Sequence, residues 1–219
     1  MRNLFLFTFF ILALPLSAQP PNGQIVFSEI MWMGSSASSA DEWIELYNTG
    51  DTALDLSNWT LTRLTSEGEQ VMLTIESGQI NPKEAFLIAN YNADHKNSRL
   101  EHTPHFVDAA LSLPNSKLQL RLYAGQPDAG ATLMDIADDG SGAPLAGDLN
   151  LKRSMVRIQL HGDGTQAESW ATAEEASGWD IESVEMGTPG SIPQQLLSPN
   201  INGSTTAVRS ESWANIKQP

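Results

Sequence analysis

The chain has 219 residues, no cysteine and a formal net charge of −14, from 12 basic and 26 acidic side chains. Without cysteine no disulfide can form, so stability must come from burial of apolar side chains, for which the length is sufficient. The acidic balance disfavours phosphate backbones and anionic lipid headgroups as partners, because a negative surface repels both. It suits basic partners, divalent cations or simple solubility, which is the commonest reason for such a charge.

Residues 1–18 have the layout of a secretory signal peptide. Arg2 precedes an apolar run over residues 4–16, and Ala18 supplies a small residue at the exit. The run is shorter than the ~20 apolar residues that a membrane span needs, and Pro15 interrupts its end. We therefore expect cleavage after Ala18 and an exported protein, secreted or at the cell surface, with no membrane span after signal removal.

The next elements are predicted to be β-strands. Residues 25–31 form a β-branched and aromatic run, and residues 42–48 alternate with a period of two, which is typical of a strand. Residues 48–51 supply turn formers. A second apolar set follows at residues 54–61, where Trp59 is expected to lie in the core.

These segments carry a family resemblance. The sequence IMWMG at residues 30–34, DEWIELYN at 41–48 and LSNWTL at 56–61 resembles the opening of a lamin tail domain, most closely its secreted bacterial forms. The likeness extends more thinly through residues 154–158 and Trp170 to Thr188-Pro189-Gly190. The resemblance implies an immunoglobulin-like β-sandwich that serves as an accessory or interaction module and not as a catalyst.

Further short strands are predicted at residues 71–75, 85–89, 118–123, 131–136 and 155–160, with the longest loops at 90–114 and 138–148. Short strands with turn signals at this spacing are typical of a sandwich or a barrel. We therefore predict an all-β, immunoglobulin-like β-sandwich with long loops over residues 25–190. A polar tail, 191–219, is expected to be disordered because it offers too little apolar surface to offset its ordering entropy.

Candidate binding residues lie on the central strand and just before the serine-rich loop. Trp32, Trp43 and Tyr47 could form a platform that stacks on sugars or a partner, but for Trp43 and Tyr47 packing beneath the serine-rich loop is favoured. Glu45 matches a recurring carboxylate of the family and is expected to bond to neighbouring backbone or a loop. Glu42 and Glu45 are three positions apart on a strand, hence on opposite faces, which argues against a glycosidase acid/base pair.

Candidate metal ligands are weaker. His102 and His105 stand three apart in the long loop, but they lack a zinc-site spacing, so a solvated loop is favoured. Asp138, Asp139 and Asp163 lie in Gly/Asp-rich loops without the alternating acids of an EF-hand. Calcium therefore stays a minor alternative, and no cofactor is predicted.

The preferred function is a noncatalytic, exported module that binds a protein or cell-envelope component at or outside the cell surface. Two alternatives stay open: an accessory domain of a secreted metal-dependent nuclease or other hydrolase, and a structural piece of a larger surface protein. Duplex DNA is not expected as a partner. The densest basic spot, Lys152, Arg153 and Arg157, is too small to overcome the repulsion by the surrounding acids.

Overall fold

A computed structural model describes residues 23–197 of the protein, so the predicted signal peptide and residues 198–219 of the predicted tail lie outside the described part. The fold is all-β, as predicted. Strand segments assemble into one large sheet, one smaller sheet and a two-stranded ribbon. The only helical elements in residues 23–197 are two 3₁₀ turns, Pro127–Ala129 and Ala167–Ser169, and a short helix, α1 (Gln194–Leu197).

The strands form two layers. The six-stranded sheet has the order β12 (Trp170–Thr172), β11 (Met155–Arg157), β1 (Ile25–Met31), β2 (Trp43–Asn48), β7 (Ala85–Ala89) and β8 (Phe106–Val107). The four-stranded sheet has the order β10 (Thr132–Ala137), β9 (Leu120–Ala124), β4 (Thr60–Thr65) and β5 (Gly68–Thr74). The ribbon pairs β3 (Leu54–Asp55) with β6 (Gln79–Ile80). Neighbours are antiparallel except β7 and β8.

One apolar core joins the two sheets. Successive side chains of a strand point to opposite faces, so Ile44 and Leu46 of β2 both face this core. Its fully buried members include Phe27, Ile30, Ile44 and Leu46 from the large sheet and Leu61, Leu120 and Leu122 from the small one. Trp59 belongs to this core, as predicted.

The second face of the large sheet is also buried. Val26 and Tyr47 are paired across β1 and β2, and they pack against Leu196 of α1 with Leu160 and Ile192 alongside. The chain therefore stays packed beyond residue 190, the predicted domain end, as far as Leu196. The overall polarity of residues 191–219 concealed two aliphatic residues, four positions apart, that cover the sheet.

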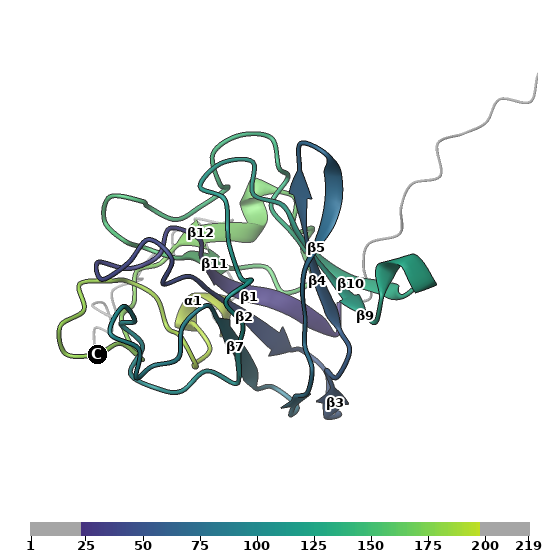
Figure 1. The fold of residues 1–219 in the computed structure, drawn as a ribbon, viewed down its shortest axis with the longest axis horizontal. Coiled ribbons are helices and arrows are strands. Elements are labelled where there is room, and N and C mark those ends of the chain that lie inside the picture. The colour runs from purple at the N-terminus through teal and green to yellow at the C-terminus, as the bar shows by residue number, and fades with distance from the viewer. Residues whose placement is uncertain (1–22, 198–219) are drawn as a thin grey trace, which may run out of the picture.

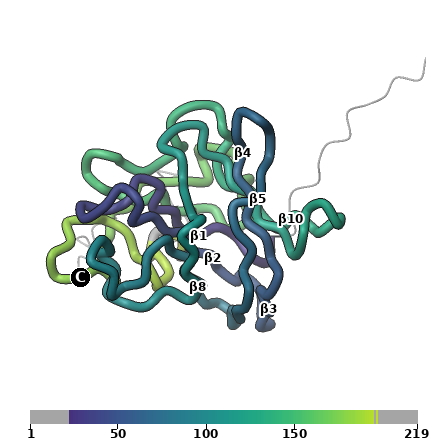
Figure 2. The backbone as a smooth tube through the Cα atoms, in the orientation of Figure 1, coloured from purple at the N-terminus to yellow at the C-terminus, as the bar shows by residue number. Residues whose placement is uncertain are grey.

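Long loops gather beside one end of the large sheet. Figure 1 shows the segments after β1, before β11 and after β12 lying together at the left of the view, and the tube in Figure 2 follows the same paths. Backbone pairing confirms the proximity: residues 153 and 186 form a parallel bridge, and residues 100 and 179 an antiparallel one. We call residues 33–41, 97–101, 148–153 and 178–186 the loop end.

Candidate functional site

The three aromatic candidates are buried. Trp32, Trp43 and Tyr47 are 5%, 0% and 5% exposed. The Trp32 indole donates a hydrogen bond to the carbonyl oxygen of Ala146 (2.9 Å), and Trp43 lies 5.8 Å from the ring of Trp179. These rings do not form an exposed platform, because distant segments cover them. They are packed inside the protein instead.

Glu45 forms the loop contact expected of it. Its Oε2 accepts a hydrogen bond from the backbone N–H of Gly190 (2.9 Å), and its Oε1 accepts one from the Ser28 hydroxyl (3.0 Å). A second carboxylate, Glu29, is paired with Glu45 in the register of β1 and β2. Glu29 accepts from both the N–H (3.0 Å) and the hydroxyl (2.6 Å) of Thr188. We call this arrangement the carboxyl clasp.

The clasp places two carboxyl groups in a fully buried setting, and both residues are 0% exposed. Burial raises the pKa of Glu29 to about 7. Burial, with the neighbouring charge of Glu29, raises the pKa of Glu45 well above its usual range. Hydrogen bonds from Ser28, Ser154 and the Thr188–Gly190 segment oppose these shifts. The clasp therefore ties the C-terminal segment to the large sheet. Sequence reasoning missed Glu29, although an acid inside the apolar run IVFSEIM was a usable signal.

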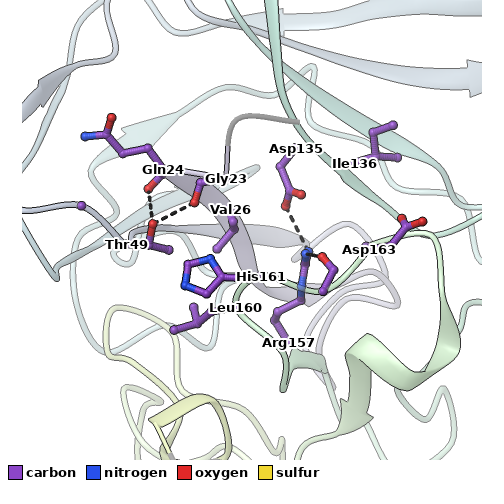
Figure 3. Close-up of a pocket in the computed structure, with 13 residues that line it drawn as sticks. Gly23, Gln24, Val26, Thr49, Asp135, Ile136, Arg157, Leu160, His161 and Asp163 are labelled. Carbon is purple, nitrogen blue, oxygen red and sulfur yellow. Dashed lines mark hydrogen bonds and ion pairs between the residues drawn. The ribbon is translucent and has the colours of Figure 1, made fainter. Parts of the chain in front are cut away.

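A pocket of about 510 Å³ lies beside β1 and β10 and is lined partly by Asp135 and Arg157. Figure 3 shows these two side chains pointing toward one another, with an Nη1–Oδ2 distance of 3.1 Å. Arg157 also donates to the carbonyl oxygens of Gln159 (3.0 Å) and Gly162 (2.6 Å), and its guanidinium lies 5.1 Å from the Trp170 ring centroid. Each of the three guanidinium nitrogens therefore donates to a protein acceptor.

The predicted basic spot of Lys152, Arg153 and Arg157 does not form. Arg157 is 1% exposed, and the Lys152 ammonium donates to the carbonyl oxygen of Met33 (3.2 Å). Arg153 lies before β11 and is half-buried. The three side chains do not form a shared patch for phosphates. Local strand periodicity could not reveal that Asp135, far away in the chain, neutralises Arg157.

The two histidine candidates contact different residues and do not share a site. His105 Nδ1 accepts a hydrogen bond from the backbone N–H of Leu87 (2.9 Å), and its ring stacks on Phe86. Burial lowers the pKa of His105, which favours the neutral ring. His102 is exposed, with its Nε2 3.7 Å from a carboxylate oxygen of Glu101. His105 thus supports the long loop against β7.

The acidic candidates serve their own loops. Asp138 is buried and accepts from the backbone N–H groups of Leu145 (2.7 Å) and Gly140 (3.1 Å). Asp139 and Asp163 are exposed, and each accepts a backbone hydrogen bond from the residue two positions later. Within residues 23–197, no three His, Asp or Glu side chains converge in a way that could hold a metal ion.

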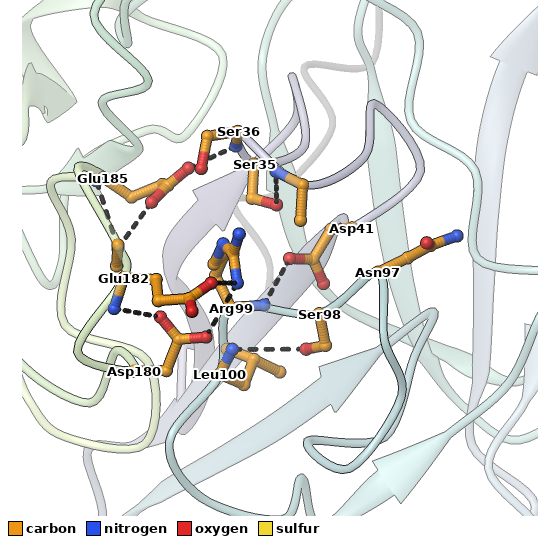
Figure 4. A network of polar contacts seen from close by, with 12 residues as sticks. Ser35, Ser36, Asp41, Asn97, Ser98, Arg99, Leu100, Asp180, Glu182 and Glu185 are labelled. Atoms are coloured by element: carbon orange, nitrogen blue, oxygen red, sulfur yellow. Dashed lines mark hydrogen bonds and ion pairs between the residues drawn. The ribbon is translucent and has the colours of Figure 1, made fainter.

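The loop end is held by a polar network (Figure 4). The guanidinium of Arg99 lies between Asp180 (3.1 Å) and Glu182 (3.0 Å), and the Arg99 backbone N–H donates to Asp41 (2.8 Å). Glu185 accepts a hydrogen bond from the backbone N–H of Ser36. These contacts join three segments that are far apart in sequence, so the loops have a defined arrangement.

Several aliphatic side chains are exposed at the loop end. Among the described residues, four of the six exposed large apolar side chains lie at the loop end: Leu149 (45% exposed), Leu151 (57%), Ile181 (102%) and Val184 (69%). We call these four the apolar tips. The backbone hydrogen bond from Met186 to Lys152 (2.9 Å) holds the segments of Leu151 and Val184 side by side. Sequence reasoning missed this surface because periodicity does not indicate exposure within loops.

The two layers and their core define an immunoglobulin-like β-sandwich. The family model of the lamin tail domain matches residues 18–141, so the chain belongs to the lamin tail domain family. No curated protein matches it. One solved structure, a DUF4876 family protein from Bacteroides thetaiotaomicron, aligns with a TM-score of 0.39 at 14% identity, over 78% of this chain and 72% of that chain. A similarity at this level supports no functional assignment. Within residues 23–197, no helix is both long enough and apolar enough to cross a membrane.

Proposed function

We propose that this protein is an exported, noncatalytic binding module that contacts a protein partner in the cell envelope or outside the cell through its loop end. The observation that carries the proposal is the set of apolar tips on an anchored loop scaffold. Exposed aliphatic groups cost solvation free energy, and their clustering on a folded surface is typical of an interaction site.

The scaffold beneath the tips favours binding. The ion pairs of Arg99 and the bond from Ser36 to Glu185 hold the loops together before any partner arrives. A surface that is already ordered loses less conformational entropy on association. Loops placed on a rigid sandwich are also the usual location of recognition residues in this architecture.

The charge around the tips indicates what kind of partner fits. Asp180 and Glu182 flank Ile181, and their side chains are 31% and 72% exposed. An apolar centre with an acidic rim is complementary to an apolar surface that is flanked by lysine or arginine. A membrane of anionic lipids would be repelled by the same rim, so a basic protein surface is the better match.

Other observations support the noncatalytic part of the proposal. Two carboxyl groups whose pKa values are strongly raised, those of Glu29 and Glu45, are fully buried and bonded to the C-terminal segment. Such groups often mark active sites, yet here they perform a structural task. Export rests on the layout of residues 1–18, and the absence of duplex DNA binding rests on the net charge and on the internal pairing of Arg157.

A capture experiment with matched variants tests the proposal. The processed protein, immobilised as bait, is exposed to envelope and culture-fluid fractions, in parallel with Leu151→Ser/Val184→Ser. The control is Val71→Ser, which changes a side chain of equal exposure (56%) on β5. We expect a saturable partner that binds wild type and the control alike and binds the double variant at least about tenfold more weakly, as for loss of central contacts. Equal capture by all three folded proteins would contradict the proposal.

A further inference from the structure

A second pocket, of about 590 Å³, lies between the β4–β5 hairpin and the loops around residues 116 and 140. Leu64 and Pro114 are half-buried and supply apolar lining, while Arg63, Ser116 and Lys117 supply polar groups. The volume falls within the ~300–1,000 Å³ that is typical of small-molecule sites. The pocket contains no residue of the loop end.

The charge of this pocket is opposite to that of the protein. Its lining holds Arg63 and Lys117 and no carboxylate, although acids outnumber bases 26 to 12 in the chain. Three other pockets differ: one is lined by Asp135 and Asp163 beside Arg157, another by two acids without a cation, and a third by three acids without a cation. Two cations without a counter-ion in a concave site favour an anion.

The donors of both cations are available. Arg63 Nη1 donates to the carbonyl oxygen of Ser112 (2.7 Å), which fixes the guanidinium and leaves its other N–H groups free of any partner among the described residues. Neither Arg63 nor Lys117 forms a salt bridge with a carboxylate of residues 23–197. Burial raises the pKa of the nearby Glu42 to about 7, and the charge of Arg63 opposes this shift.

The backbone at Lys117 is held in an unusual conformation. Its φ is +55°, in the left-handed region that non-glycine residues seldom occupy. The N–H of Lys117 donates to the carbonyl oxygen of Gly142, and the N–H of Gly140 donates to that of Leu118, so two loops enforce the conformation together. Backbone strain of this kind is commonly retained at ligand sites.

We propose that this pocket binds a small organic anion, with its carboxylate between Arg63 and Lys117 and its apolar body against Leu64 and Pro114. An arginine fork pairs well with a carboxylate, and the lysine adds a second positive charge. The apolar lining favours an anion with an apolar body over a simple inorganic ion. The site is separate from the loop end, so the two proposals can fail independently.

The test is an NMR titration of the ¹⁵N-labelled processed protein with benzoate as the probe. Benzamide, which has nearly the same shape without the charge, and inorganic phosphate, which has charge without an apolar body, serve as matched probes. We expect benzoate to shift the amide signals of Leu64, Ser116, Lys117 and Gly140 with a Kd of about 1–10 mM, typical of so small a ligand. Benzamide and phosphate should bind at least about tenfold more weakly, because each lacks one of the two interactions.

Variants locate the binding. Arg63→Gln and Lys117→Asn should each weaken benzoate binding at least about tenfold; asparagine tolerates the left-handed backbone that Lys117 adopts. Lys96→Asn, an exposed lysine outside the pocket, is the matched control and should bind as wild type does. Leu151→Ser/Val184→Ser should also bind benzoate normally, which separates this proposal from that of the loop end.

Three outcomes would overturn the proposal. The first is equal shifts with benzoate and benzamide, and the second is phosphate binding as tightly as benzoate. The third is that Arg63→Gln and Lys117→Asn leave the benzoate shifts unchanged while both variants keep the dispersed amide spectrum of the folded protein. Absence of any saturable shift up to about 50 mM benzoate would do so as well.

Discussion

The buried face of the large sheet and the loop end both contain acidic residues, but burial gives them different tasks. Glu29, Glu45 and Asp135 lie within the fold, where nearly every oxygen has a defined donor and burial raises their pKa values. At the loop end, Asp180 and Glu182 are partly exposed and share Arg99. In this protein buried acids with raised pKa values hold the structure together, while the two acids that flank Ile181 on the surface proposed for binding are partly exposed.

The largest effect should come from breaking the buried ion pair. Arg157→Ala leaves Asp135 without its counter-ion in a site that is 4% exposed, and removes donors from two carbonyl groups. Removing one partner of a buried pair typically costs ~3–5 kcal/mol. Denaturant unfolding at neutral pH measures the loss. Recovery of most of it in Arg157→Ala/Asp135→Asn would confirm that the unpaired charge is the cause, whereas a loss below ~1 kcal/mol would show that the pair is unimportant.

The second-largest loss of stability should come from removing the contact between the C-terminal segment and the large sheet. Leu196 is 5% exposed and packs on Val26 and Tyr47 in a small cluster apart from the main core. Leu196→Ala should cost about 2 kcal/mol, the lower end for buried leucine, because a peripheral site can relax around the missing atoms. Val71→Ala, on an exposed part of β5, is the control. Equal unfolding midpoints for both variants would place the domain end before α1.

The contrast between these sites also shows what the sequence could predict. The period of two in residues 42–48 predicts β2, and Tyr47 packs in a cluster separate from that of Ile44 and Leu46. The family segments indicated the sandwich. Neither signal could show that residues 179–196 return to cover the second face of β2, because that contact joins segments over a hundred residues apart.

Polar partners were equally hidden. The basic neighbours of Arg157 in the sequence predict a basic spot, whereas its ionic partner belongs to the other sheet. The loop contact expected of Glu45 is present. The exposure of the apolar tips could not be predicted, because aliphatic residues in a loop follow no periodic pattern. Local patterns thus predicted strands and faces, and the tertiary pairing of charges needed the structure.

The third effect is a pH dependence of stability that arises from the carboxyl clasp. The pKa of Glu29 is raised from 4.5 to about 7 by burial, so the folded protein retains a proton that the unfolded chain releases. The stability contributed by this group is fully present below about pH 4.5 and is lost as pH rises to about 7. Glu42, with a pKa of about 7, and Asp135, with a pKa of about 6, act in the same direction.

Urea unfolding between about pH 5 and pH 8 measures this dependence. We expect the free energy of unfolding of wild type to fall over this range, and to fall less in Glu29→Gln, whose amide keeps the shape without titrating. Glu67→Gln, an exposed change in the β4–β5 turn, should follow wild type. A slope in Glu29→Gln identical to that of wild type would mean that Glu29 keeps the same protonation in the folded and unfolded states.

The smallest effect on stability should come from Arg99→Ala at the loop end. Its partners Asp180 and Glu182 have side chains that are 31% and 72% exposed, so water can replace the guanidinium when it is removed. Exposed ion pairs contribute little because solvent screens them and because ordering long side chains costs entropy. The loss of global stability should therefore be several-fold smaller than that of Arg157→Ala, although both variants remove an arginine paired to aspartate.

Locally the result should differ, because Arg99 joins two segments of the loop end. Amide hydrogen exchange should become faster in residues 178–186, while β1 and β2 keep the protection of wild type. Unchanged exchange in residues 178–186 would show that the loops are ordered without Arg99. Faster exchange throughout both sheets would show that the loop end is as integral to folding as the buried face, and the distinction between the two regions would not hold.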